Sequence, residues 1–223
     1  MKNSKEHAQR LQRLYRELKR AYPGVERAVY DDPVEALICG IINERMHESA
    51  AQRAFRDITR AFVDWNDLRV SRVEEVAEAL GRKTASCRAT ALALTTALRG
   101  IFDEHHRISL ANLKKLGKRP ARQGLEKIEG VSRFVVNYCL LTSLEAHAVP
   151  LTGEMADYLR RLGVIDPGAN DEQIESFLTR HVPAKNAYEF YVLLRRESEA
   201  LKVMRKINKS RPHPKGKGNG RKG

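Results

Sequence analysis

Cysteine is scarce in this sequence of 223 residues, which contains only Cys39, Cys87 and Cys139, roughly fifty residues apart. That number and spacing match neither a disulfide framework nor a metal-ligand motif. We therefore expect three free thiols packed on helix faces, and no metal site. Free thiols also suit a reducing cytoplasm, where the protein would associate with the nucleoid if its source is bacterial.

Long apolar segments are missing as well. The longest apolar run, Ala36 to Ile42, is far too short to span a bilayer. The first residues, MKNSKEHAQRLQRLYREL, contain no apolar core of the kind that a signal peptide requires. We therefore expect neither a membrane partner nor a secretion signal.

Acidic residues are too few to balance the basic ones. The chain has 41 Lys and Arg against 28 Asp and Glu, a net charge of +13 and a pI near 9.9, which indicates a polyanionic partner such as nucleic acid. Residues 202–223 hold nine of the cations and no acid, so the rest of the chain, with 32 cations against 28 acids, has a charge of only +4. We expect a disordered basic tail at the C-terminus, which either only aids solubility or also adds weak DNA affinity through counterion release.

Alternation of apolar and polar residues with period two does not persist anywhere, whereas helical spacing runs through most of the chain. The sequence therefore predicts an all-α fold of about ten helices. Asp32 is typical of an N-cap before a proline at the first helical position, and Ser71 of the N-cap in a capping box. The expected helices are Ser4–Ala21, one from Asp32, Glu48–Phe62, a short one from Ser71 to Gly81, Thr84–Glu104, two short ones from Ser109 and from Pro120, Ser132–Ala146, Gly153–Leu162, Asp171–His181 and Ala184–Ile207.

A single tight turn, Gly130-Val131-Ser132, interrupts the helical pattern of EKIEGVSRFVVNYCLL. The first N–H groups of the helix after the turn have no partner within that helix and carry the positive end of its dipole. Because Gly130 has no side chain, an anion can approach the backbone closely, as a DNA phosphate would. Arg133 and Lys127 would add positive charge. Glycine-containing turns between helices are also common as purely structural features.

The segment LEKIEGVSRFVVNYCL resembles the helix-hairpin-helix of the endonuclease III-like DNA glycosylase superfamily, whose consensus reads Leu-Pro-Gly-Val-Gly. Three further segments fall in the order of that family. They are DPVEALICGIINERMHESAAQRAF, similar to an early core helix and its DNA-wedging loop, LGRKTASCRATALALTTAL, similar to a long core helix, and AVPLTGEMADYLRRLGV, similar to the segment downstream of the hairpin. The resemblance covers about residues 30–200.

The resemblance implies a two-lobed helical fold that binds double-stranded DNA, including damaged or distorted DNA, as a monomer. We expect residues 1–33 to form an N-terminal helix that packs with the C-terminal lobe, and 34–148 to form a six-helix-type domain containing the hairpin at about 120–146. Residues 149–207 would form the C-terminal lobe, and 208–223 the tail. The four cysteines of the iron–sulfur loop found in many relatives are absent, so no cofactor is expected.

Members of the family flip a damaged base out of the duplex and cleave its glycosidic bond. By this resemblance, the lysine with which bifunctional members attack the sugar falls on Phe134, and the aspartate with which active members stabilise the positive sugar falls on Thr152. Loss of the lysine alone would be compatible with a monofunctional glycosylase, but a threonine hydroxyl cannot supply the negative charge of the aspartate. Lys83, in GRKTA, lies outside the expected hairpin and is not expected to replace the lysine.

Glu154, at the position of the family's histidine, is the fallback acid. If a helix begins at Thr152, two residues turn it by about 200°, so Glu154 is expected to face away from the Thr152 pocket and to complement the helix dipole. Thr152 itself is typical of an N-cap. In the wedge loop, Arg45 stands at the position of the glutamine that fills the gap left by a flipped base, and it either enters the duplex or remains a solvated arginine.

The leading hypothesis is a DNA-binding protein on a base-excision-repair scaffold whose catalytic residues have been replaced, and which grips DNA phosphates at Gly130, Val131 and Ser132. One alternative is a monofunctional glycosylase with a rearranged site that uses Glu154 or another acid. Another is a helical adaptor for protein or RNA that retains only the fold.

Overall fold

The computed structural model describes residues 4–81 and 84–210, of which 202–210 are described as backbone only. These residues form α-helices and two short 3-10 helices, with no strand among them, so the prediction of an all-α fold is confirmed. In chain order the helices are α1 (Ser4–Ala21), α2 (Pro33–Arg45), α3 (Glu48–Ala61), α4 (Trp65–Val70), α5 (Val73–Ala79), α6 (Ala85–His105), η1 (Ala111–Lys115), α7 (Lys118–Glu126), α8 (Arg133–Thr142), α9 (Gly153–Arg161), α10 (Asp171–His181), η2 (Ala184–Asn186) and α11 (Ala187–Ser210).

Local sequence signals place several helix ends correctly. Asp32 caps α2 as predicted, because its carboxylate accepts a hydrogen bond from the Val34 N–H at 2.9 Å and Pro33 follows it. The predicted role of Ser71 is wrong. Ser71 closes α4, a helix that the sequence analysis missed, and its hydroxyl donates to the Asp67 carbonyl at 2.8 Å. Arg72 then opens α5, with its backbone N–H held by the Glu75 carboxylate at 3.2 Å.

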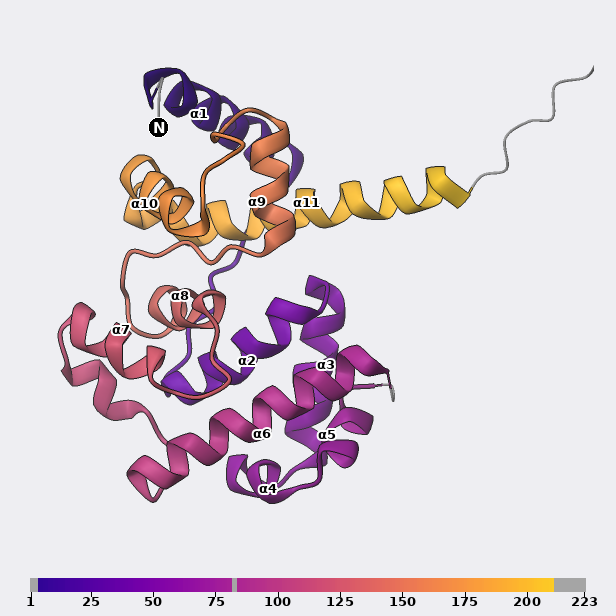
Figure 1. The fold of residues 1–223 in the computed structure, drawn as a ribbon, viewed down its shortest axis with the longest axis vertical. Coiled ribbons are helices and arrows are strands. Elements are labelled where there is room, and N and C mark those ends of the chain that lie inside the picture. Colours follow the sequence, from indigo (N-terminus) through magenta and orange to yellow (C-terminus); the bar gives the residue numbers. More distant parts are fainter. Residues whose placement is uncertain (1–3, 82–83, 211–223) are drawn as a thin grey trace, which may run out of the picture.

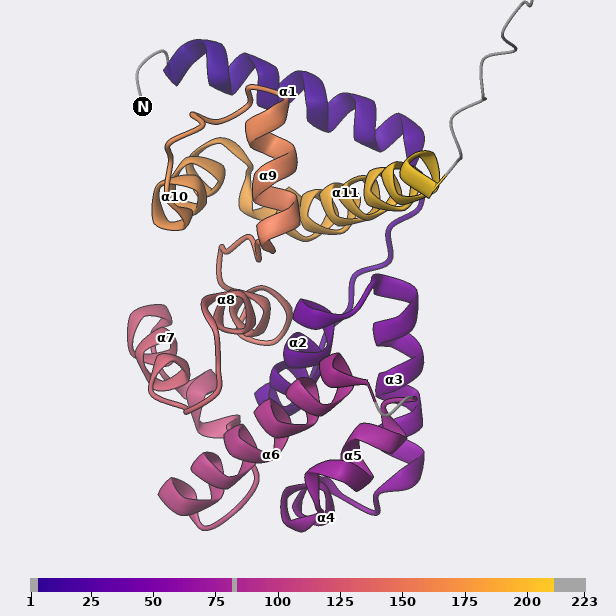
Figure 2. The same ribbon diagram turned by 45° about the vertical axis from the view of Figure 1, so that its right-hand side comes forward.

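The helices gather into two lobes (Figures 1 and 2). Helices α2 to α8 form one lobe, and α1 lies with α9, α10 and α11 in the other. The chain leaves the second lobe after α1 and returns to it only after α8. Side chains hold α1 to α11 across this large sequence separation, for example through a hydrogen bond from the Tyr22 hydroxyl to the Glu197 carboxylate at 2.8 Å.

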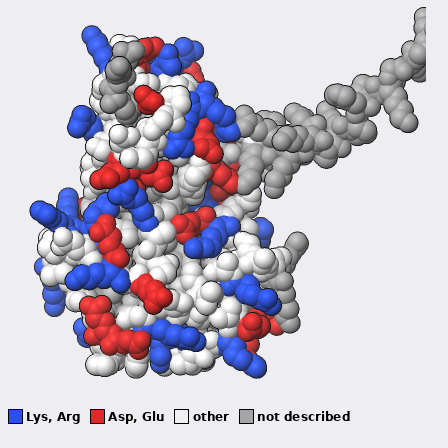
Figure 3. All heavy atoms as spheres, in the orientation of Figure 1, with Lys and Arg blue, Asp and Glu red and all other residues white. Residues whose placement is uncertain are grey.

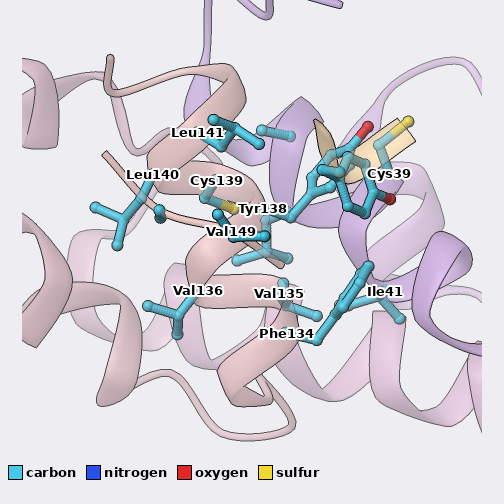
Figure 4. Packing of buried hydrophobic residues seen from close by; sticks show 14 of the residues in the cluster. Cys39, Ile41, Phe134, Val135, Val136, Tyr138, Cys139, Leu140, Leu141 and Val149 are labelled. Atoms are coloured by element: carbon cyan, nitrogen blue, oxygen red, sulfur yellow. The ribbon is translucent and has the colours of Figure 1, made fainter. Parts of the chain in front are cut away.

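Helix α2 is the centre of its lobe. It packs against α8, α3 and α6, and every residue from Pro33 to Ile42 except Glu35 is buried. A helix that is apolar on all sides is stable only when it is covered on all sides, which explains the continuous apolar run from Ala36 to Ile42. Figure 4 shows the contact between α2 and α8, in which Ile41 lies near Phe134.

A buried arginine ties the two lobes together. Arg195 of α11 has a side chain that is 3% exposed. Its guanidinium donates to the Asn43 side-chain oxygen at 2.7 Å, to the Asn43 carbonyl at 2.9 Å and to the Met46 carbonyl at 2.6 Å. The Glu199 carboxylate accepts from the same guanidinium at 2.8 Å, which compensates its buried charge. The loop between α2 and α3 is therefore fixed against α11.

The C-terminal end of α11 differs from the predicted tail boundary. The helix continues to Ser210, so residues 208–210, assigned to the tail from sequence, are helical. The remainder of the tail lies outside the described residues. No helix in the described part of the chain is long and apolar enough to cross a membrane.

Candidate nucleic-acid interface and inter-lobe cavities

The turn between α7 and α8 has the backbone geometry that the sequence predicts. Gly130 is exposed and has φ of +80°, a conformation that side chains with a Cβ disfavour. A Cβ at Gly130 would also lie 3.3 Å from the Ala93 carbonyl oxygen of α6. Glycine is therefore required both by its own backbone angle and by the close approach of α6.

Ser132 is the N-cap of α8, and its hydroxyl accepts a hydrogen bond from the Val135 N–H at 3.3 Å. The N–H groups of Arg133 and Phe134 precede the first intrahelical bond and donate to no carbonyl or side chain within the described residues. Since α8 starts at the surface beside an exposed glycine, its positive end is accessible to an anion.

The two cations expected beside the turn differ in availability. Lys127 is exposed and has no ion-pair partner within the described residues. Arg133 is exposed, but its Nε lies 3.7 Å from the Glu175 carboxylate of α10. Arg133 therefore contributes less free charge than its sequence position suggests.

Asn137 and Glu175 form a polar connection between the hairpin and α10. Asn137 is 1% exposed. Its amide oxygen accepts from Arg122 of α7 at 2.8 Å, and its amide nitrogen donates to the Glu175 carboxylate at 2.6 Å. Burial raises the pKa of Glu175, while Arg133 and Arg122 oppose that rise. This network sets the orientation of the hairpin relative to the second lobe.

Phe134, where the resemblance predicts the lysine of bifunctional relatives, is part of the core. It is 4% exposed, and its ring stacks on Tyr138 with a centroid separation of 6.2 Å and lies 6.2 Å from the Tyr191 ring. In Figure 4 the ring points toward α2. The space that a nucleophilic side chain would need is filled by this aromatic cluster.

A cavity of about 270 Å³ lies beyond the aromatic cluster, where the N-terminal linker and α2, α3, α8 and α11 meet. Four tyrosines line it, namely Tyr30, Tyr138, Tyr188 and Tyr191. The Tyr30 hydroxyl donates to the Cys39 sulfur at 3.0 Å, and burial raises the pKa of Tyr191 to about 12. The cavity therefore offers neutral hydroxyl groups and aromatic rings beside the charged side chains of Glu48, Arg56 and Arg195.

A second cavity, of about 430 Å³, lies between the α2–α3 loop and the first turn of α9. Thr152 lines it and caps α9 as predicted, accepting from the Met155 N–H at 3.3 Å. Glu154 lines the same cavity, although the rotation of an isolated helix predicts that it faces away from Thr152. Residues 43–47, at the end of α2 and in the loop after it, border this cavity together with the start of α9.

Carboxylates dominate this second cavity, which we call the acidic cavity. Its acidic lining residues are Glu44, Glu154, Asp157 and Glu199. Arg45 also lines it and forms an ion pair with Glu44. His47 is 3.5 Å from the Glu199 carboxylate. No group of residues in the described part of the chain is arranged to hold a metal ion.

Sequence reasoning missed the contacts made across large separations. Asn137, Glu175 and Arg195 carried no signal in the sequence, because each is defined by partners on other helices. The predicted DNA-binding residues Gly130, Val131, Ser132, Arg133 and Lys127 do gather at one turn, whereas Arg45 lies apart from them at the C-terminal end of α2. Lys83 lies outside the described residues.

Comparison with known proteins identifies the architecture. Over 84% of both chains, the structure matches endonuclease III in a trapped covalent complex with DNA, with a TM-score of 0.66 and 15% identity. The chain has the endonuclease III-like helix-hairpin-helix fold. It also matches the Clostridium acetobutylicum 8-oxoguanine glycosylase/lyase in complex with DNA, with a TM-score of 0.66 and 17% identity over 90% of this chain and 71% of that one.

A third structure with this fold is the Helicobacter pylori 3-methyladenine DNA glycosylase, matched with a TM-score of 0.56 and 15% identity over 92% of this chain and 98% of that one. In sequence, the chain is 21% identical over 161 residues to an Arabidopsis thaliana protein named as a candidate DNA glycosylase. The match covers 72% of this chain and 55% of that protein, so the chain spans about half the length of this curated relative. No family model matches the sequence.

Proposed function

We propose that this protein binds duplex DNA through the turn between α7 and α8 and does not cleave the glycosidic bond by the route of its structural relatives. The observation that carries the proposal is the turn itself, with its exposed Gly130 at φ +80° and the N–H groups of Arg133 and Phe134, which have no acceptor within the described residues. Backbone groups of this kind bind phosphate oxygens without reading the base sequence. The same fold occurs in glycosylases solved in complex with DNA.

Two substitutions argue against the usual chemistry. Phe134 has no nucleophilic atom and is stacked in the core. Thr152 directs its hydroxyl to the α9 backbone as a cap, and a hydroxyl lacks the negative charge that stabilises an oxocarbenium-like sugar. A Schiff-base step has no lysine at this position, and the positive sugar has no carboxylate at the family's position.

The tyrosine-lined cavity would accept an extruded base. A flat heterocycle stacks favourably on aromatic rings, and the neutral tyrosine hydroxyls can hydrogen-bond to its edge. Binding an extruded base without cutting it is the behaviour of a sensor of damaged or distorted DNA. The protein would then mark a lesion for another factor.

The test is a binding assay paired with a cleavage assay on the same damaged and undamaged duplexes. We expect salt-sensitive retardation of duplex DNA, no release of free base and no covalent adduct after borohydride reduction. Truncation after Leu201 removes nine cations and is expected to weaken binding without abolishing it. Loss of all binding on truncation would show that the hairpin is not the binding element.

A monofunctional glycosylase is the second candidate, and the position of Glu154 favours it. Glu154 lines the same cavity as Thr152, so a carboxylate is present near the family's aspartate position. If this candidate holds, purified protein releases a base from at least one damaged duplex, and Glu154→Gln abolishes release while retaining DNA binding. Asp157→Asn, in the same cavity and on the same helix, is the matched control.

A further inference from the structure

The positive charge of this protein is concentrated in two segments. Residues 105–125 contain six Lys or Arg and no Asp or Glu, and residues 202–223 contain the nine cations of the C-terminal end. The rest of the chain has 26 cations against 28 acids, a charge of −2. Outside the C-terminal end, the basic character of the protein therefore resides in the single stretch that leads into the hairpin.

The structure holds these cations at the surface. We call Arg107, Lys114, Lys115, Lys118 and Arg119 the basic strip, since all five are exposed, in the loop just after α6, on η1 and on the start of α7. Figure 3 shows Lys and Arg side chains projecting from the edge of the molecule that holds α7 in Figure 1. None of the five forms an ion pair within the described residues.

The strip is anchored from beneath and is continuous with the turn. Leu113 of η1 is buried, and its side chain lies against Gly124 of α7, where a Cβ would approach it to 3.1 Å. Helix α7 is about 13 Å long from Lys118 to Glu126, and residues 127–129 then lead to Gly130. The length of the helix corresponds to about four base pairs of duplex.

We propose that the basic strip is a second contact for duplex DNA, which grips backbone phosphates about four base pairs from those held at the turn. The proposal rests on the proposed function, because the duplex must already lie at the hairpin. Five exposed cations without ion-pair partners, on one edge of an otherwise slightly acidic body, create a positive field that attracts a polyanion. Flexible Lys and Arg side chains suit the backbone of a duplex, since phosphate contacts need no fixed geometry.

The experiment measures how duplex affinity depends on salt. Lys114, Lys115, Lys118 and Arg119 are all changed to Gln in one variant of the full chain. The matched control changes four exposed cations of α1 in the other lobe, Lys5, Arg13, Arg16 and Arg20, to Gln. Each phosphate contact contributes about −0.9 to the slope of log affinity against log salt, so the strip variant is expected to lose about 3 to 4 units of slope and the α1 variant none.

A charge-retaining variant, with each strip Lys changed to Arg and Arg119 changed to Lys, is expected to keep the wild-type slope and separates charge from folding. The wild type is also expected to gain affinity as the duplex is lengthened by about four base pairs beyond the hairpin footprint, and the strip variant is expected to lose this gain. Equal losses of slope in the strip and α1 variants would overturn the proposal.

The result also distinguishes this proposal from the proposed function. If wild type binds duplex in a manner sensitive to Gly130 but the strip variant keeps its slope, only the strip proposal falls. If wild type binds no duplex, both fall. If the strip variant loses affinity for single-stranded RNA of equal length but not for duplex DNA, the assignment of the strip to DNA is wrong.

Discussion

Gly130→Ala tests whether the backbone of the turn is a DNA contact. The substitution places a Cβ on a residue with φ of +80° and 3.3 Å from the Ala93 carbonyl oxygen. The left-handed backbone alone costs about 1 to 2 kcal/mol, and the smaller entropy of the unfolded chain returns about 0.4 to 1 kcal/mol. Because the Ala93 contact adds to this, we expect a net loss of about 1 to 2 kcal/mol in the free energy of unfolding.

A change of this size leaves the protein folded, since ordinary domains have about 5 to 15 kcal/mol of stability. Binding can therefore be measured on a folded variant. A charge-assisted hydrogen bond between a backbone N–H and a phosphate contributes about 1.5 to 3 kcal/mol, so losing one is expected to weaken duplex binding by roughly ten- to a hundredfold. Urea denaturation and fluorescence anisotropy with a labelled duplex supply the two quantities.

Gly24→Ala is the matched control. Gly24 has φ of +79°, almost the same as Gly130, but a Cβ there would meet nothing within 4 Å. It should lose about 1 kcal/mol of stability from the backbone angle and bind duplex as wild type does. If Gly130→Ala loses stability yet binds duplex with unchanged affinity, then no phosphate approaches the turn and the proposed interface is wrong.

Three further predictions concern residues that position the site. Burial holds the pKa of Glu175 above its ordinary value of 4.5, so the folded state retains the proton longer than the unfolded state, and the unfolding free energy falls as pH rises through this region. Glu175→Gln should remove that fall, and urea denaturation at about pH 4 and about pH 7 should show the variant gaining stability relative to wild type at the higher pH. Arg195→Met should lower the free energy of unfolding by about 3 to 5 kcal/mol, because Glu199 and the carbonyls of Asn43 and Met46 lose their shared partner. A decrease below about 1 kcal/mol in urea denaturation would show that water replaces the guanidinium. Thr152→Ala should lower the free energy of unfolding by about 1 kcal/mol, because α9 loses its N-cap. A change in duplex affinity would contradict a purely structural role for Thr152.

Much of the fold follows from local signals in the sequence. Asp32, Ser132 and Thr152 are N-caps both by sequence pattern and by hydrogen bond, because capping depends on residues only two or three positions apart. The prediction that Ser71 is an N-cap is wrong for a related reason. Its pattern fits a capping box, but α4 ends at the same residue and takes its hydroxyl, and six-residue helices such as α4 leave little periodic signal.

The site was less predictable because its contacts are long-range. Arg133 looked like a free cation beside the turn, yet Glu175 neutralises it from a helix 42 positions later in the chain. The rotation of one isolated helix predicts the direction of Glu154. The acidic cavity that Glu154 lines is also bordered by the α2–α3 loop, which lies more than 100 positions earlier in the chain. Nothing within either helix indicates such a partner.

In the proposed function, DNA binding and cleavage would depend on different atoms. The proposed phosphate grip uses backbone N–H groups at the start of α8, and the missing side chain of Gly130 lets the turn lie close to α6. By the resemblance to the family, cleavage would instead require particular side chains at the positions of Phe134 and Thr152. Phe134 packs against Tyr138 and Tyr191. A lysine placed there would be buried with no carboxylate at Thr152 to pair with its charge, so burial would favour the neutral amine. The core would also lose the packing of the aromatic ring. Because the two proposed roles rely on separable atoms, our proposal that the chain binds DNA without cleaving it requires no change in the backbone of the turn.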